Sequence, residues 1–398
     1  MLNNEFSEKI YFYIFKEIQF IWKKLNYVIG LVLLWSCSTK NESTDGFGTL
    51  EFTFEIDTLL VDSKGEMLMA GTRMFVSDVS KDKKFLYNFD QSSYQVEVFD
   101  LDKLALDRKI KLEKEGPDGI ENPSEIFDLG NGQLGFTNST YFTIIDSLGR
   151  KISQYRADGM KWDSDSLMNT EKLDPSYLFA NGTKEFYTLI DHFNENSTIL
   201  GLVNFETKSL KKIEIQNLDK LKDFTIQLSI GNASVSNNPL VTLYSWNNQI
   251  LIGNNAFNEI IVYDPLSESI SVKAFESKLT PNQRIPNEKV EMGSIEELIA
   301  ESKKLNEQID FGKLNWDPLT QRFYRLSSIS LPRPEGVKTF KADVFLAVFD
   351  QELNMIGETK VEGYTKPPSV IFFKGGAIWL HENINDELGF IRMKISEK

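Results

Sequence analysis

The feature that most constrains this chain is a strand, loop, strand unit that recurs along most of its length. Its clearest copy is Gln249–Pro265, which reads QILIGNNAFNEIIVYDP. β-Branched residues lie two positions apart in both halves, Asn254–Asn258 supplies residues that favour turns, and Asp264 with Pro265 ends the second half. A period of two is that of a β-strand, so the unit is predicted to be a β-hairpin with one buried face.

Six copies of this unit follow one another. Two further short apolar runs flank each of the first five hairpins, and the sixth has only the run before it. The run before the hairpin is joined to it by residues suited to tight turns, such as Asn247-Asn248 and Gly375-Gly376. A complete unit therefore contains four predicted strands. The predicted first strands of the six hairpins are Phe85–Asp90, Gly132–Asn138, Glu185–Asp191, Gln249–Asn255, Phe323–Ser328 and Ala377–Asn383.

Four-stranded antiparallel units arranged radially are the blades of a β-propeller. The sixth copy ends at Met393–Ile395 without an outer strand, whereas Thr49–Leu60 alternates like a strand and belongs to no copy. We therefore predict an all-β, six-bladed β-propeller over residues 49–398, in which the N-terminal strand completes the last blade and closes the ring. A β-sandwich or two smaller β domains are the alternatives, and the complementary defect at the two ends favours the propeller.

The N-terminal segment has the order of a secretory signal. Two lysines precede the apolar run Tyr27–Trp35, and a small residue stands directly before Cys37, the only cysteine. This order resembles a bacterial lipoprotein signal, which implies a signal peptide over residues 1–36 and an acylated Cys37 that begins a flexible tether over residues 37–48. The alternatives are an uncleaved anchor helix and a buried structural cysteine.

The formal net charge of −14 limits the classes of partner. Binding to a nucleic-acid backbone requires a clustered positive field, so we expect no nucleic-acid partner. A single cysteine also excludes a disulfide or a thiolate metal cluster within the chain. Hydrophobic residues make up 41% of the sequence, which is enough to build a large core.

Two insertions are predicted to lie on one face of the propeller, Glu276–Phe311 between blades four and five and Ser328–Lys341 within blade five. Functional loops gather on such faces. A helix is predicted over Ser294–Gln308, where Ser294 and Glu297 form a capping box. Its predicted apolar side contains Ile295, Leu298, Ile299 and Leu305. The helix is expected either to cover part of the channel or to pack on the rim.

Catalytic motifs are weak in this sequence. His192 and His381 fall at equivalent places in blades three and six, so they are predicted to lie far apart and are not expected to share a metal. Either one could serve as an acid or base, although a lone histidine is more often structural. Asp163 and Asp165 could offer oxygens to calcium, but the glycine and glutamate of a hand-type loop are missing. No metal and no cofactor are therefore expected.

Aromatic and basic residues near the inner hairpins are the predicted ligand-binding residues. Flat aromatic rings can stack on sugars, and arginines can hold anionic groups. The alternative for each tryptophan is packing between blades. These candidates are Trp246, Trp316, Arg322, Arg325 and Trp379.

The chain resembles the six-bladed propeller lipoproteins of Bacteroidota that form the domain of unknown function 4221 family. The resemblance rests on the lipoprotein signal before Cys37, on Glu115–Gly119 after the first blade, and on Leu314–Asp317 followed by Phe323–Leu326. It implies a lipid-anchored protein of the outer membrane, periplasmic or exposed at the surface, and it implies no activity or catalytic residue.

Two functions from different classes follow from these observations. The first is a scaffold or binding module of the cell envelope without catalysis, tethered to the membrane by its lipid and offering its loop-rich face to a protein or glycan ligand. The second is a propeller lyase or hydrolase that acts on a glycan or a lactone, with His192 or His381 as its acid or base. The missing catalytic motifs favour the binding module.

Overall fold

The computed structural model divides the chain into two units, Met1–Gly48 and Thr49–Lys398. The predicted signal peptide, Cys37 and tether lie outside the described residues. No helix in the described part of the chain is long and apolar enough to cross a membrane. The structure describes residues 50–68, 74, 76–157, 159–179, 185–192, 195, 197–231, 233–333 and 340–398.

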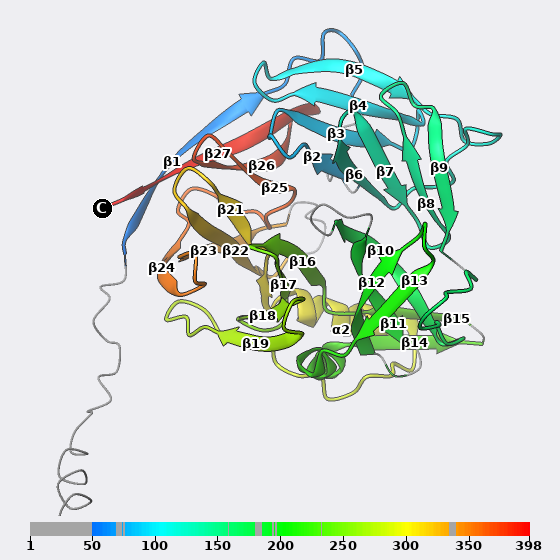
Figure 1. The fold of residues 1–398 in the computed structure, drawn as a ribbon. Helices are drawn as coiled ribbons and strands as arrows, with labels where there is room; N and C mark the ends of the chain where they lie inside the picture. The colour runs from blue at the N-terminus through cyan, green and yellow to red at the C-terminus, as the bar shows by residue number, and fades with distance from the viewer. Residues whose placement is uncertain are drawn as a thin grey trace, which may run out of the picture. The chain divides into compact units, whose positions relative to one another are not determined.

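Six antiparallel sheets form the blades of the second unit, and each contains four strands in the predicted order (Figure 1). Blade one contains β2 (Ser77–Val79), β3 (Phe85–Asp90), β4 (Gln95–Asp100) and β5 (Ala105–Lys111). Blade two contains β6 (Glu125–Gly130), β7 (Gln133–Thr137), β8 (Tyr141–Ile145) and β9 (Lys151–Arg156). Blade three contains β10 (Glu171–Phe179), β11 (Phe186–His192), β12 (Ser197–Asn204) and β13 (Ser209–Ile213).

The remaining blades follow the same plan, with one irregularity in blade five. Blade four contains β16 (Val241–Trp246), β17 (Gln249–Asn254), β18 (Glu259–Asp264) and β19 (Ser269–Ala274). The inner strand of blade five is split into β20 (Ile309–Phe311) and β21 (Asn315–Asp317), followed by β22 (Arg322–Ser330), β23 (Ala342–Phe349) and β24 (Met355–Lys360). Blade six contains β25 (Ile371–Lys374), β26 (Ala377–Ile384), β27 (Glu387–Glu397) and β1 (Phe52–Leu60). The predicted six-bladed propeller is confirmed.

The ring is closed by the N-terminal strand, as predicted. Strand β1 pairs with β27 antiparallel, from Phe52 opposite Glu397 to Leu60 opposite Gly389. The two strands approach so closely at Gly389 that an added Cβ would lie 2.8 Å from the carbonyl oxygen of Leu59. Pairing with β1 covers an edge of β27 that would otherwise be open to another chain.

The core consists of apolar clusters between consecutive blades, and this arrangement corrects one prediction about the hairpins. In β17, Ile250 and Ile252 pack against blade three, whereas Leu251 packs against blade five. Both faces of this strand are buried, not one, because each blade lies between two neighbours. Solvent reaches the outer strand, where every residue of β19 is exposed.

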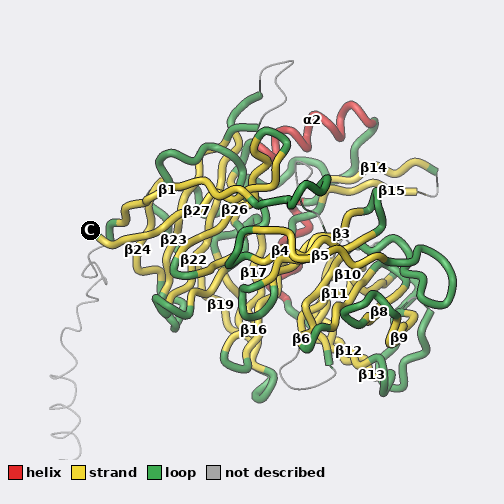
Figure 2. The backbone as a smooth tube through the Cα atoms, turned by 90° about the horizontal axis from the view of Figure 1, so that it is seen from above, coloured by secondary structure: helices red, strands yellow, loops and turns green. Residues whose placement is uncertain are grey.

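The insertions contain more structure than was predicted. The predicted helix is α2 (Ile295–Asn306), and the Ser294 side chain accepts a hydrogen bond from the Glu297 backbone N–H (3.2 Å). Before blade four, the chain also forms a 3₁₀ helix, η1 (Gln216–Phe224), and a hairpin of β14 (Ile226–Ile230) and β15 (Ala233–Asn237), neither of which was predicted. Figure 2 shows α2 and this hairpin on the same side of the propeller.

The buried side of α2 is narrower than the predicted apolar side. Leu305 is buried and Leu298 is partly buried, and both pack with residues of β14 in a small apolar cluster. Ile295 and Ile299, in contrast, are 54% and 64% exposed. The predicted apolar side was therefore wrong in these two positions, because the narrow hairpin beneath the helix covers only one stripe of it.

Candidate functional site in the central channel

Charged side chains lie on or next to the innermost strands of four blades. We define the channel cluster as Asp78 in β2, Lys83 in the turn after β2, Glu125 at the start of β6, Asp174 in β10, and Lys313 between β20 and β21. Inner strands border the channel of a propeller, so charges placed there are not needed to fill the apolar boundaries between blades.

These charges act on one another although they belong to different blades. Lys313 of blade five interacts with Asp78 and Lys83 of blade one and with Glu125 of blade two. Blade six separates blade five from blade one on one side, and blades three and four separate it from blade two on the other. Lys313 is exposed and the other four are half-buried, so water reaches the cluster.

A break in the inner strand of blade five places Lys313 in the channel. At Gly312 the chain passes so close to β22 that an added Cβ would lie 2.3 Å from the carbonyl oxygen of Leu326. The Gly312 N–H donates to the same oxygen (3.1 Å), and Asn315 Nδ2 donates to the carbonyl oxygen of Lys313 (3.0 Å). These contacts fix the backbone on both sides of the lysine.

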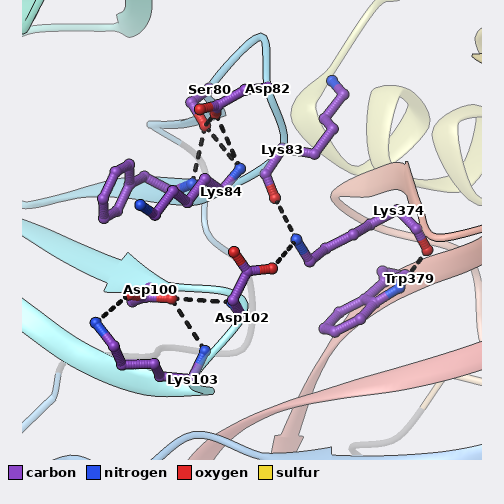
Figure 3. A network of polar contacts seen from close by, with 10 residues as sticks. Ser80, Asp82, Lys83, Lys84, Asp100, Asp102, Lys103, Lys374 and Trp379 are labelled. Carbon is purple, nitrogen blue, oxygen red and sulfur yellow. Dashed lines mark hydrogen bonds and ion pairs between the residues drawn. The ribbon is translucent and has the colours of Figure 1, made fainter.

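Lys83 is held in a backbone conformation that side chains other than glycine seldom adopt, with a φ of 58°. Its N–H donates to the Ser80 carbonyl oxygen (2.8 Å), and its own carbonyl oxygen accepts from Lys374 Nζ of blade six (2.9 Å). Lys374 Nζ also contacts Asp102 Oδ1 (2.6 Å). Figure 3 shows this network, with the Lys83 side chain pointing away from Lys374 and Asp102.

The protein engages some members of the cluster and leaves others without partners. Asp78 accepts from the backbone N–H groups of Val79 and Asp128 (both 2.8 Å), and Asp174 accepts from the N–H of Ser176 (2.7 Å). Among the described residues, the side chains of Lys83, Glu125 and Lys313 form neither a hydrogen bond nor an ion pair. These three groups are therefore available to a ligand.

Burial destabilises the ionised forms of Glu125, Asp78 and Lys83. Burial, followed by the charge of Asp174, raises the pKa of Glu125 to about 7. The positive charge of Lys313 opposes this shift, and Asp78 adds a smaller effect in the same direction as Asp174. Burial also raises the pKa of Asp78, although two backbone N–H groups oppose the shift. Burial lowers the pKa of Lys83. The negative charge of Asp78 opposes this shift, and the positive charge of Lys313 adds to it by a smaller amount. Clusters of shifted pKa values are typical of functional sites.

His192 lies at the end of β11, opposite Glu171 of β10. Its Nε2 is 3.3 Å from Thr170 Oγ1, and its Nδ1 is buried without a hydrogen-bond partner in the described chain. The Glu171 carboxylate is already engaged, since it accepts from Lys212 Nζ (2.6 Å) and from the Met168 N–H (2.7 Å). This carboxylate is therefore tied into a structural ion pair.

His381 lies in β26, on the opposite side of the ring. Its side chain is buried, and neither ring nitrogen has a partner among the described residues. Burial lowers its pKa, and the nearby carboxylate of Glu382 opposes this shift. Neither histidine is a member of the channel cluster. In the portion of the chain described here, no group of three histidine, cysteine, aspartate or glutamate side chains is arranged to hold a metal ion.

Two of the predicted ligand-binding residues meet between blades four and five. The rings of Trp246 and Trp316 are 4.1 Å apart between centroids, and both pack on Phe323. The Arg322 guanidinium in the same blade forms an ion pair with Glu397. These two rings therefore pack between blades, which was the alternative considered for each tryptophan.

Arg325 and Trp379 are only 2% and 4% exposed, so their side chains offer no surface to a ligand. Arg325 donates to Asn258 and lies within cation–π distance of three phenylalanine rings. Trp379 packs in blade six and donates from Nε1 to the Lys374 carbonyl oxygen (3.2 Å). The structure therefore does not bring the five predicted residues into one site.

Sequence reasoning missed the channel cluster because its members follow no motif. Asp78 lies in β2, the inner strand of blade one, and Glu125 begins β6, the inner strand of the next blade. A usable signal was the repeated appearance of a charge at the innermost strand of a blade, where neighbouring positions are apolar. That signal becomes visible only when the copies are aligned by blade.

A family model described as "Domain of unknown function (DUF4221)" matches residues 49–360. The crystal structure of a DUF4221 family member from Bacteroides vulgatus is similar, with a TM-score of 0.64, 15% identity, and coverage of 88% of this chain and 99% of that chain. The β-propeller domain of Cps50 (Swd1) from Myceliophthora thermophila gives a TM-score of 0.41 and 7% identity, over 84% of this chain and 99% of that chain. The search of curated proteins gave no match.

Proposed function

Since the chain belongs to the DUF4221 family, whose function is unknown, we propose from its geometry that it is a binding propeller of the cell envelope that acts without catalysis. The channel is the proposed binding site. One observation carries this proposal: Lys83, Glu125 and Lys313 converge on the channel from three blades and have no partners among the described residues. A protein gains nothing in stability by holding such charges apart and partly desolvated, so a ligand that compensates them explains their placement.

The proposal also includes a tether, because the segment before Cys37 has the order of a lipoprotein signal. Acylation of Cys37 would anchor the propeller at the outer membrane, either in the periplasm or at the surface. Metabolic labelling with an alkyne fatty acid tests this step. We expect the exported wild-type chain to be labelled and the Cys37→Ala variant to remain unlabelled, whereas an exported but unlabelled wild-type chain would contradict the tether.

Capture of the full chain from intact cells, followed by mass spectrometry of what accompanies it, tests the binding function. We expect the wild-type chain to retain a ligand or partner that is depleted when Lys83 and Lys313 are both replaced by glutamine. The Lys211→Gln variant is the matched control, because Lys211 forms an exposed ion pair with Glu268 away from the channel (2.5 Å). Equal recovery with all three proteins would rule out the channel as the binding site.

A propeller lyase or hydrolase remains the second candidate function. The observation in its favour is that His192 of β11 lies opposite Glu171 of β10 in the sheet. Against it, Lys212 and a backbone N–H already hold the carboxylate. The test is to incubate the wild-type chain with a panel of glycans and lactones. Turnover that is lost in His192→Ala but kept in His381→Ala would show that the protein is an enzyme and would contradict the binding function. We expect no turnover above the rate without protein.

A further inference from the structure

Lys374, the last residue of β25 in blade six, makes two contacts with blade one. Its Nζ donates to the carbonyl oxygen of Lys83 (2.9 Å) and to Asp102 Oδ1 (2.6 Å), residues that lie 291 and 272 positions away in the chain. The Asp102 side chain is 59% exposed, so the ion pair by itself contributes little to stability. The contact with the Lys83 carbonyl oxygen is therefore the one with a structural consequence.

Blade six holds Lys374 in place for this contact. Trp379 Nε1 donates to the Lys374 carbonyl oxygen (3.2 Å), and the Trp379 ring packs on Phe372 and Phe390 in the apolar cluster between blades six and one. Figure 3 shows these contacts in sequence, from the tryptophan through Lys374 to the turn that contains Lys83. The position of Lys374 thus depends on the packing of blade six against blade one.

Lys83 is a residue whose conformation needs support from its neighbours. Its φ of 58° lies in the left-handed region, which costs free energy for a side chain other than glycine. Among the described residues, Lys374 is the one hydrogen-bond donor to the Lys83 carbonyl oxygen. The Lys83 side chain points away from Lys374 (Figure 3). Fixing the carbonyl group toward blade six therefore fixes the direction in which this side chain leaves the backbone.

The alternative is that the turn in blade one positions Lys83 without help. The Ser80 carbonyl oxygen accepts from the Lys83 N–H (2.8 Å), and Ser80 Oγ accepts from the Lys84 N–H (3.1 Å). Asp82 Oδ1 also accepts from the Lys84 N–H (3.0 Å). The peptide group between Lys83 and Lys84 is therefore held from both sides, its N–H by blade one and its carbonyl oxygen by blade six.

We infer that Lys374 is a positioning residue for the channel, which directs the Lys83 side chain by holding its carbonyl group and so couples the docking of blade six on blade one to the binding site. The functional part of this inference rests on the proposed binding function, and the geometric part rests on the two contacts of Lys374. Coupling of this kind is reciprocal, so a ligand that engages Lys83 would also stabilise the boundary between these blades.

The test follows the Lys83 side chain by NMR in the purified full chain, with lysine labelled with ¹³C at Cε and ¹⁵N at Nζ and the Lys83 signal assigned from Lys83→Arg. The main variant combines Lys374→Met with Asp102→Asn. It removes both contacts and leaves the local net charge unchanged, because one positive and one negative group are lost together. Burial lowers the pKa of Lys83 in the wild-type chain. We expect the signal in the double variant to move and to titrate at higher pH, toward the range of exposed lysines.

Three further variants separate position from charge and from general loss of stability. Asp102→Asn alone keeps the donor to Lys83 and should cause no upward shift of its titration. Lys374→Arg keeps a charged donor and should retain most of the wild-type signal. The control pair Lys211→Met with Glu268→Gln removes an exposed ion pair elsewhere (2.5 Å) and should leave Lys83 unchanged. Circular dichroism and urea midpoints show whether each variant is folded.

The inference is wrong if Lys83 titrates in the double variant as it does in the wild-type chain, because the turn of blade one would then position it alone. No ligand enters this measurement, so its result does not depend on the proposed function. Capture from intact cells tests the coupling separately. We expect the double variant to lose the channel-dependent partner, and full retention of that partner by a variant in which Lys83 has moved would overturn the coupling to binding.

Discussion

Single residues in this propeller show how burial alters charge. Glu125 is half-buried among like charges, and its pKa in the folded chain is about 7 instead of the ordinary 4.5. Arg325 is buried between blades and has no carboxylate partner in the described part of the chain, and burial lowers its pKa to about 9. We expect Glu125 to make the free energy of unfolding depend on pH, and Arg325 to contribute to it by filling space between blades.

Glu125 makes the stability of the fold depend on pH. Its folded pKa is raised, so between pH 4.5 and about 7 the native chain holds a proton that the unfolded chain has lost, and the free energy of unfolding falls as pH rises. We expect Glu125→Gln to remove roughly 2–3 kcal/mol of this fall, measured by urea denaturation at pH 5 and pH 8. Glu352→Gln, at an exposed turn, is the control, and the same pH dependence in Glu125→Gln would contradict the assignment.

Arg325 is held by rings and one amide. The centroids of Phe311, Phe349 and Phe275 lie 5.1, 5.2 and 5.6 Å from its guanidinium carbon. We expect Arg325→Ala to lower the free energy of unfolding by about 3–5 kcal/mol, because it leaves a cavity among these rings.

Replacement of the same arginine by methionine separates packing from charge. Arg325→Met fills most of the volume and removes a desolvated cation, so we expect it to be within about 1.5 kcal/mol of the wild-type chain or more stable. Urea midpoints of the two variants provide the comparison. Equal losses in both would mean that the charge itself, and not the filled volume, stabilises this boundary.

At the scale of elements, α2 and the β14–β15 hairpin pack together on one side of the propeller. Leu305 anchors the helix in the apolar cluster with β14, whereas Ile299 of the same helix is exposed. We expect Leu305→Ala to cost about 2–4 kcal/mol locally and to speed hydrogen exchange in α2, and Ile299→Ala to leave both unchanged. Equal effects of the two variants would mean that the helix is held by another surface.

Elements that repeat were predictable from sequence, and elements that occur once were not. The blades were predictable because a period of two and turn residues recur in six copies, so that weak local signals reinforce one another. The hairpin of β14 and β15 has no second copy and was not predicted. Without it, Ile295 and Ile299 were predicted to lie on the buried side of α2, where they do not lie. The channel position of Lys313 depends on the close approach at Gly312, which involves backbone contacts that no sequence pattern reports.

At the scale of the whole propeller, closure of the ring brings distant positions of the chain to one channel. The β1–β27 pairing joins the two ends of the propeller, and the six apolar boundaries hold the blades around the axis. Charges separated by more than 200 residues, such as Asp78 and Lys313, then interact electrostatically. A binding site in the channel is therefore a property of the closed ring and not of any single blade.

Native mass spectrometry of the folded full chain, purified directly from its cells, tests the central claim that the channel holds a ligand. We expect the wild-type chain to carry a non-covalent small-molecule adduct that is released on denaturation. The triple variant Lys83→Gln, Glu125→Gln, Lys313→Gln should be folded and free of this adduct. A wild-type chain without any adduct, or an adduct that the triple variant retains in full, would contradict the account.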